Sequence, residues 1–498
     1  MNYLNNNFNL CFLGLYSELF LLLSLLFAIC FLVILDNKFN HKINLINTAN
    51  NLFVYILVCS LLLIKNLFTI EFSLFYNILI SNRYVVLCKF FLIILFIIIS
   101  ILSKSYLKKE QIYIYEYFLI LGLVLFGLFT IISSNDLLVM YIGIEILSLS
   151  FYILATLKLN SNFSTEAGLK YFILGSFSSG LLLYGTSLIY GATGTLNFSD
   201  IHLLWDEMVF LTLIDPNTLI IGSIFISVAI LFKLGAAPFH MWLPDVYEGA
   251  PTIITMIFSI VPKLAIFILF FHLGVNFFNF NLIYLWQLLF FVSVISITVG
   301  TFGALYQTKI KRMLAYSAIS HIGFLLIAFL IFKSSTLFSL FFYITVYIII
   351  SLNIFTLLFV TRKYTNNLKL KKINEFSILF KSNPILAINF ALILFSIAGI
   401  PPLVGFYSKF YIFTFALRYE LYMIVISAAV LSVIGCMYYI RLIKLMFFKN
   451  FNYWTLFQTI NKFESYLLSI TLMFNILFFC YPELFVVGLY NIILEAYI

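Results

Sequence analysis

Long apolar stretches, separated by short polar segments, follow one another along the whole chain. Most of them hold about 20 largely apolar residues, the length that a helix needs to cross the hydrocarbon core of a membrane. They predict fourteen spans, near residues 12–35, 50–68, 84–103, 112–133, 136–157, 167–190, 218–243, 252–272, 283–305, 313–332, 337–361, 384–415, 420–447 and 464–490. We therefore expect an all-α polytopic membrane protein without a soluble domain.

Two predicted spans, the seventh and the twelfth, contain residues that interrupt helices. The seventh carries Gly235 and Pro238, and the twelfth carries Gly399, Pro401 and Pro402. Interrupted backbone is tolerated at membrane depth only where protein or a water-filled cavity satisfies its polar groups. The two spans are five helices apart, and an odd offset reverses orientation. Spans 4–8 and 9–13 are therefore predicted to be inverted five-helix repeats with broken helices in corresponding places.

This pattern predicts a single membrane domain over residues 1–498, with three N-terminal helices in 1–111, the first repeat in 112–272, the second in 283–448 and a C-terminal helix in 449–498. Basic residues support the span count, because inner loops carry an excess of Lys and Arg. Of the 28 such residues, 20 belong to loops after odd-numbered spans, 5 to loops after even-numbered spans and 3 to span interiors. Both termini are expected outside, and the net charge of +9 reflects topology rather than nucleic-acid binding.

Four ionisable residues lie deep in predicted spans or beside a break: Glu145, Lys233, Lys263 and Lys409. Charges at this depth normally face a bundle interior, pair with one another and mark ion or proton routes. Glu145 can stay ionised beside one lysine, which leaves the other lysines without an evident carboxylate. A lysine of that kind can bind and release a proton. His321, inside the tenth span, is a candidate relay because imidazole titrates near neutral pH.

Purely structural explanations exist for the same residues. Glu145 and one lysine could form a buried pair that only fixes helix packing, and a lysine near a span end could extend to the membrane interface. The second explanation suits Lys89 better than Lys263, whose neighbours are apolar on both sides. His321 could equally be a hydrogen-bonded contact between helices.

The sequence contains no GxGxxG after a predicted strand, no Walker loop and no His or Cys spacing typical of haem, iron–sulfur or zinc ligation. We therefore expect no metal and no cofactor in this chain, so that any redox chemistry would take place elsewhere. The abundance of Phe, Tyr, Asn, Ile and Lys, residues with AT-rich codons, is typical of an organelle genome, although an AT-rich bacterium would look similar.

Four segments are distinctive; they read DLLVMYIGIEILSLSFYIL, FKLGAAPFHMWLPDVYEGAPT, KRMLAYSAISHIGF and AGIPPLVGFYSKFY. Together they resemble the chain 2 family of antiporter-like membrane subunits of respiratory NADH:ubiquinone oxidoreductase, complex I. A lysine at Lys409, where some sister subunits have glutamate, favours chain 2 among them. The resemblance implies that Glu145 and Lys233 form a coupled pair. It also implies that Lys263 is the central proton carrier, that Lys409 lies at the exit branch and that His321 joins a hydrated axis.

By the same resemblance, quinone reduction in another part of the complex drives proton transfer, and FMN, iron–sulfur clusters and ubiquinone belong to other subunits. This chain would then be a subunit of an NADH:ubiquinone reductase without a redox centre of its own. Its partners would be other membrane subunits, including neighbouring antiporter-like ones, and lipids. The expected location is the mitochondrial inner membrane, with multiple spans and both termini on the intermembrane-space side. A bacterial plasma membrane and a thylakoid are the alternatives.

Two other functions share these features. A subunit of a multisubunit cation/proton antiporter would have the same broken helices and buried charges, but it would not copurify with flavin and iron–sulfur subunits. A membrane scaffold would use the buried charges only to lock helices together, so that replacing Lys263 with Met would preserve or increase its stability.

Overall fold

A computed structural model of the chain describes residues 2–36, 42–65, 72–75, 77–158, 160–208, 216–277, 283–331, 334–364, 369–449, 456–478, 481–483 and 486–488. These residues are almost entirely helical, which confirms the all-α membrane class. The sheet within them is a small antiparallel hairpin of β1 (Phe72–Leu74) and β2 (Leu79–Ser81), with Phe72 opposite Ser81.

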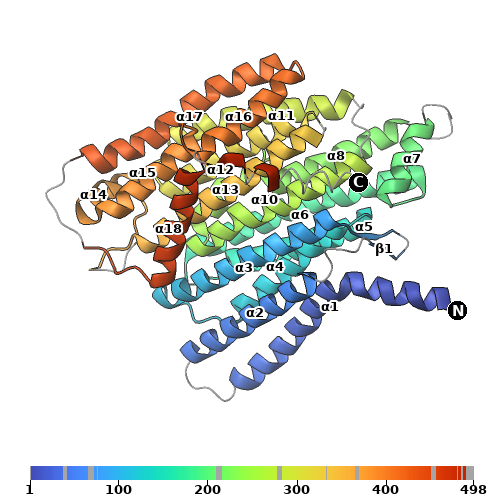
Figure 1. The fold of residues 1–498 in the computed structure, drawn as a ribbon, viewed down its shortest axis with the longest axis horizontal. Helices are drawn as coiled ribbons and strands as arrows, with labels where there is room; N and C mark the ends of the chain where they lie inside the picture. Colours follow the sequence, from blue (N-terminus) through green and yellow to red (C-terminus); the bar gives the residue numbers. More distant parts are fainter. Residues whose placement is uncertain are drawn as a thin grey trace. The chain divides into compact units, whose positions relative to one another are not determined.

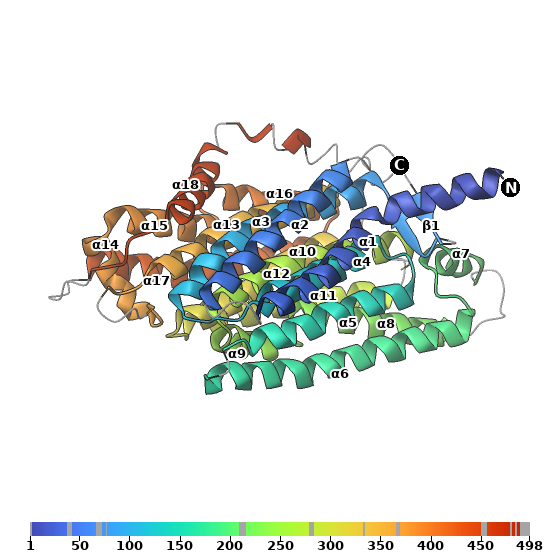
Figure 2. The ribbon, with the colours of Figure 1, turned by 90° about the horizontal axis from the view of Figure 1, so that it is seen from below.

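The chain divides into two compact units, of which the first comprises the described residues of Met1–Lys233 and Leu264–Leu282. Its elements, besides the hairpin, are α1 (Asn2–Asp36), α2 (Lys42–Lys65), α3 (Arg83–Lys109), α4 (Glu116–Ser133), α5 (Leu137–Ala155), α6 (Asn162–Thr193), α7 (Phe198–Met208) and α8 (Pro216–Leu234). Helices α1 to α4 lie side by side (Figures 1 and 2). Close contacts of Gly127 with α5 and of Gly143 with α4 allow these two helices to approach without intervening side chains.

The second unit comprises the described residues of Leu234–Lys263 and Ile283–Ile493. Its elements are α9 (Trp242–Gly249), the first half of α10 (Thr252–Asn276), α11 (Ile283–Leu305), α12 (Ile310–Phe329), α13 (Ser334–Val360), the 3₁₀ helix η1 (Ile373–Ile378), α14 (Leu379–Ser382), α15 (Pro384–Ala398), α16 (Val404–Arg418), α17 (Tyr422–Phe448) and α18 (Lys462–Leu477). In their apolar windows, 89% of α12 and 83% of α13 are buried, against 39% of α17. Helices α12 and α13 therefore form the core of this unit.

Both predicted interruptions are present. Helix α8 ends at Leu234, Gly235 follows with φ +79°, and helical structure resumes in α9. Helix α15 ends at Ala398, Gly399 follows with φ +85°, and α16 begins at Val404. A positive φ is accessible to glycine at little cost, so each glycine ends its helix at a defined residue. The arrangement of the two five-helix sets as inverted repeats stays a prediction.

Twelve helices of the described chain are long and apolar enough to cross a membrane. The predicted span 384–415 corresponds to the consecutive helices α15 and α16, and the span 464–490 begins with α18. Residues 479–480, 484–485 and 489–498 lie outside the described residues, so the count of fourteen stays a prediction. Helix α1 also extends back through the Asn-rich N-terminal segment to Asn2.

The interpretation of Lys89 as a lysine that extends to the interface is wrong. Its ammonium forms an ion pair with Glu18 of α1, and the side chains are only 4% and 7% exposed. The hydroxyl of Ser17 donates a hydrogen bond to the second carboxylate oxygen of Glu18 at 2.6 Å. A buried ion pair therefore joins α1 to α3 within the first unit.

Candidate functional site

The second unit contains one of the predicted central lysines in a defined hydrogen bond. Lys263 lies in the middle of α10 and is 4% exposed. Its Nζ donates a hydrogen bond to the hydroxyl of Tyr347 on α13 at 2.8 Å and lies 4.3 Å from the centre of that ring. No ion pair of Lys263 with a carboxylate is present among the described residues. The lysine therefore has a partner that accepts a hydrogen bond and carries no negative charge.

His321 makes a similar contact one helical turn away along α13. It is 8% exposed, and its Nδ1 lies 2.6 Å from the hydroxyl of Tyr343. The imidazole and the ring of Tyr347 have centres 5.4 Å apart. Residues i and i+4 lie on the same face of a helix, so α13 presents Tyr343 and Tyr347 together. A tyrosine hydroxyl can both donate and accept a hydrogen bond, which suits a proton relay as well as a static contact.

Lys409 takes its position from the break between α15 and α16. Its Nζ donates a hydrogen bond to the carbonyl oxygen of Ala398, the last residue of α15, at 2.8 Å. The last carbonyls of a helix lack partners within it and carry partial negative charge, so they favour a cation nearby. The ammonium also lies 5.3 Å from the centre of the Phe324 ring, a cation–π contact with α12.

Tyr347, the partner of Lys263, lines a cavity of about 40 Å³. Its lining includes His321, Tyr343, Tyr347 and Lys409, together with the hydroxyl-bearing Ser259, Ser317, Ser351, Ser396 and Ser408. The serine hydroxyls donate to backbone carbonyls of their own helices, which leaves their oxygen lone pairs available as acceptors. The volume exceeds what one water molecule needs, and the lining supplies several polar partners for it. The cavity can therefore support a hydrogen-bonded chain between the basic groups.

Glu145 and Lys233 lie in the first unit. Glu145 on α5 is partly buried, and its Oε1 is buried without a hydrogen-bond partner, while the hydroxyl of Ser148 lies 3.5 Å from Oε2. Lys233, the penultimate residue of α8, is 8% exposed, and its Nζ lies 6.0 Å from the centre of the Tyr152 ring. No ion pair joins Glu145 to Lys233 in the described structure. The coupled pair implied by the resemblance thus stays a prediction, with Glu145 on α5 and Lys233 near Tyr152 of the same helix.

The tyrosines of this site were not predicted from the sequence. Tyr343 and Tyr347 lie four residues apart in the otherwise apolar run FFYITVYIII, a spacing that places two hydroxyls on one helix face. That spacing could have identified the two tyrosines as candidate site residues. Tyr247 on α9, which is 2% exposed, lines the same cavity and was also missed. Among the described residues, no group of three His, Cys, Asp or Glu side chains could hold a metal ion.

The comparisons with known proteins agree with this architecture. The family described as NADH:quinone oxidoreductase/Mrp antiporter, transmembrane, matches residues 134–435. NADH-ubiquinone oxidoreductase chain 2 of Marchantia polymorpha is 39% identical over 95% of this chain and 96% of its own length. NADH-quinone oxidoreductase subunit N of Pelagibacter ubique is 40% identical over 60% of this chain and 62% of its own length.

Solved structures show the same fold. A chain of respiratory complex I from Thermus thermophilus superposes with a TM-score of 0.77 at 23% identity, covering 95% of this chain and 99% of its own. A chain of the Mrp complex from a Dietzia species superposes with a TM-score of 0.79 at 18% identity, covering 97% of each chain. The match over residues 134–435 and the similarity to chain 2 proteins along nearly the whole length confirm the resemblance. The chain belongs to the NADH:quinone oxidoreductase/Mrp antiporter transmembrane family.

Proposed function

We propose that this chain carries protons across a membrane as the antiporter-like chain 2 subunit of a respiratory NADH:ubiquinone oxidoreductase. The observation that carries the proposal is the buried Lys263, which donates to Tyr347 beside a cavity that His321 and Lys409 also line. A buried ammonium without a carboxylate partner is costly in a membrane and normally marks an ion or proton pathway. A lysine that served only packing would be expected to pair with an acid.

In the proposed mechanism, protons move between Lys263 and the cavity through hydroxyl groups. Neutral Lys263 accepts a proton and, as an ammonium, donates its hydrogen bond to Tyr347. Tyr347 and Tyr343 are amphoteric hydrogen-bonding groups, and His321 at the hydroxyl of Tyr343 can take up or release a proton through either ring nitrogen. Lys409 also lines the cavity and acts as the exit group. Glu145 and Lys233 act as the coupled pair whose charge changes drive the transfer.

The chain acts within an enzyme and contributes no redox centre in this proposal. FMN, iron–sulfur clusters and ubiquinone would be bound by other subunits, and the driving force would come from quinone reduction there. Its partners would be neighbouring membrane subunits and lipids. The location supported best is the mitochondrial inner membrane, because the similar chain 2 proteins include those of plants and an animal. Both termini would face the intermembrane space, as the basic loops indicate.

The decisive experiment compares Lys263→Met with the unsubstituted assembly after purification and reconstitution into vesicles. Proton uptake or release, NADH oxidation and subunit content are measured in the same preparation. We expect Lys263→Met to assemble and to lose proton translocation together with coupled turnover. Lys158→Met is the matched control, because Lys158 is 45% exposed and forms its ion pair with Glu110, away from the cavity lining.

Each alternative has a distinct outcome in this experiment. A scaffold role predicts full assembly with unchanged pumping and unchanged or increased stability of Lys263→Met. A cation/proton antiporter predicts that the chain purifies without flavin and iron–sulfur subunits and that a sodium or potassium gradient drives proton movement. Unchanged pumping in a fully assembled Lys263→Met complex would refute the proposed proton carrier.

A further inference from the structure

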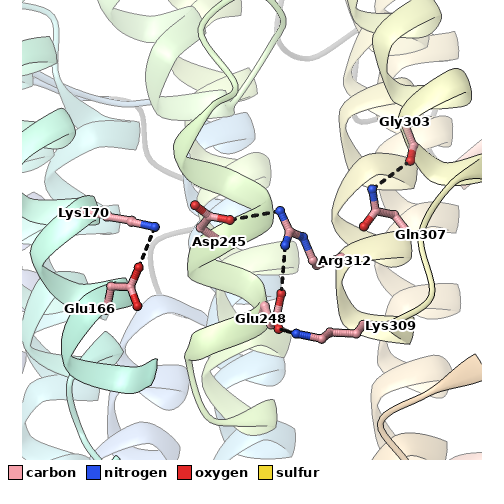
Figure 3. Close-up of polar contacts among 8 residues, drawn as sticks. All are labelled: Glu166, Lys170, Asp245, Glu248, Gly303, Gln307, Lys309 and Arg312. Atoms are coloured by element: carbon pink, nitrogen blue, oxygen red, sulfur yellow. Dashed lines mark hydrogen bonds and ion pairs between the residues drawn. The ribbon is translucent and has the colours of Figure 1, made fainter. Parts of the chain in front are cut away.

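The short helix α9 is held by charged side chains from the start of α12 (Figure 3). The Nη2 of Arg312 lies 3.2 Å from Oδ1 of Asp245, and its Nη1 lies 3.3 Å from Oε2 of Glu248. Lys309 forms a further ion pair with Glu248. One guanidinium therefore bridges two carboxylates that lie three residues apart, on one face of α9.

A third cation holds the end of the same helix. The Nζ of Lys311 donates a hydrogen bond to the carbonyl oxygen of Ala250, the residue that caps the C-terminus of α9. Because α9 has only 8 residues, its own hydrogen bonds are too few to keep it helical without tertiary contacts. The ion pairs and this hydrogen bond are such contacts. The geometry of α9 thus depends on the first turn of α12.

The opposite face of α9 is buried. Trp242, Leu243, Val246 and Tyr247 are all at most 5% exposed, and Tyr247 lines the cavity that contains His321. The ion-pair face is accessible to water: the Arg312, Asp245 and Lys309 side chains are 35%, 36% and 47% exposed. Within the second unit, α9 therefore has water on one side and the basic cavity on the other.

We propose that Arg312 is a positioning residue that holds α9 as a gate between the aqueous phase and this cavity. With the two carboxylates bridged, α9 keeps Tyr247 against the cavity and limits the access of water and protons. When the bridge opens, α9 is free to move, and the cavity gains a path to the water on the side of the basic loops. The proposal rests on the proposed function, because it assigns the route by which protons reach this cavity and Tyr347, the partner of Lys263.

The first test measures access to the cavity directly and does not depend on pumping. Ser317→Cys places a thiol in the cavity lining. The rate at which this thiol reacts with a small membrane-impermeant reagent is measured in the assembled complex. The rate in the complex without this substitution is subtracted to correct for the native thiols. Arg312→Gln in this background is expected to raise the rate about tenfold or more, because an open form that is initially 0.1–10% populated becomes common. Arg312→Lys, which keeps the charge but loses the bridging geometry, should give an intermediate rate.

A control variant leaves the ion pairs of α9 intact, and a double variant removes its two carboxylates. Lys158→Gln removes a cation from the ion pair with Glu110, which involves neither α9 nor α12, and should leave the rate unchanged. The double variant Asp245→Asn with Glu248→Gln keeps Arg312 and should raise the rate as Arg312→Gln does. It also provides the test if Arg312→Gln does not assemble. In complexes without the added thiol, these variants should pump fewer protons per NADH oxidised, while NADH oxidation continues.

The outcomes separate this proposal from the proposed function. An unchanged thiol reaction rate in assembled Arg312→Gln and in the double variant would overturn the gate, whatever the pumping result. A raised rate in a complex that pumps normally would also overturn it, since the gate would then not lie on the proton route. If the unsubstituted complex does not pump, the proposed function fails, and the reaction rates still decide whether α9 closes the cavity.

Discussion

Removing Lys89 is expected to release helix α1 from the first unit. Lys89 on α3 forms an ion pair with Glu18 on α1, and both side chains are almost fully buried, at 4% and 7% exposure. Ser17 already donates to the other oxygen of Glu18. In Lys89→Met, the carboxylate would stay in an apolar setting with one neutral hydrogen bond and no cation.

The magnitude follows from the asymmetry of buried ion pairs. Removing one partner leaves an uncompensated buried charge and typically costs about 3–5 kcal/mol, whereas replacing both partners with apolar residues of similar volume is often neutral or stabilising. We therefore expect Lys89→Met to lower the opening free energy of α1 by about 3–5 kcal/mol. The double variant Glu18→Leu with Lys89→Met should lie within about 1 kcal/mol of the unsubstituted protein, so that the two single changes are strongly non-additive.

Hydrogen exchange of the α1 backbone in the assembled complex measures this opening free energy, and native electrophoresis checks assembly. All three variants are compared at one pH and one lipid composition. Two results would refute the reasoning. One is a loss below about 1 kcal/mol in Lys89→Met, the size of an exposed ion pair. The other is a double variant as unstable as Lys89→Met, which would mean that the packing of the lysine chain, not its charge, holds α1.

Three further changes test other contacts. Tyr347→Phe removes the hydrogen-bond acceptor of Lys263 and keeps the ring. Because hydrogen bonds to charged groups contribute roughly 1.5–3 kcal/mol, the variant should slow coupled proton pumping about tenfold or more. Normal pumping by a fully assembled variant would contradict this. Gly405→Ala would place a methyl group 1.7 Å from a backbone oxygen of α15 and should lower the stability of the protein in thermal unfolding by about 1–3 kcal/mol or more. Gly180→Ala is the control: no atom lies within 4 Å of its added methyl group, so the protein should be equally or slightly more stable. Asn353→Leu removes the 2.7 Å hydrogen bond that joins α13 to α18 and should lower the free energy of unfolding by about 0.6–1.7 kcal/mol in the same measurement. An increase in the unfolding temperature would show that the amide does not stabilise the protein.

Features that depend on the local sequence could be predicted. Glycine and proline interrupt helices for reasons that lie in their own covalent structure, so the ends of α8 and α15 beside Gly235 and Gly399 followed from the sequence. The depth of Lys263 followed similarly, because apolar residues extend for several turns on both sides of it.

Features that depend on distant pairing could not be predicted. The depth of Lys89 was misjudged from its distance to a span end, while the deciding fact is Glu18, 71 residues earlier in the chain. The tyrosine partners were hidden for another reason. With 60 Phe and 32 Tyr in the sequence, an aromatic residue in a span is no signal by itself, and only the fold shows that Tyr347 faces Lys263.

The hydrogen bond of Lys409 to a backbone carbonyl determines which mutations can break it. A carboxylate partner could be lost by one codon change at its own position, but the carbonyl of Ala398 belongs to the backbone and survives every side-chain replacement there. The vulnerable position is Gly399 instead, whose φ of +85° is unfavourable for other residues and whose added Cβ would lie 3.2 Å from the lysine Nζ. Inherited variants at Gly399 are therefore expected to reproduce the phenotype of a lost Lys409, although the lysine codon itself is intact.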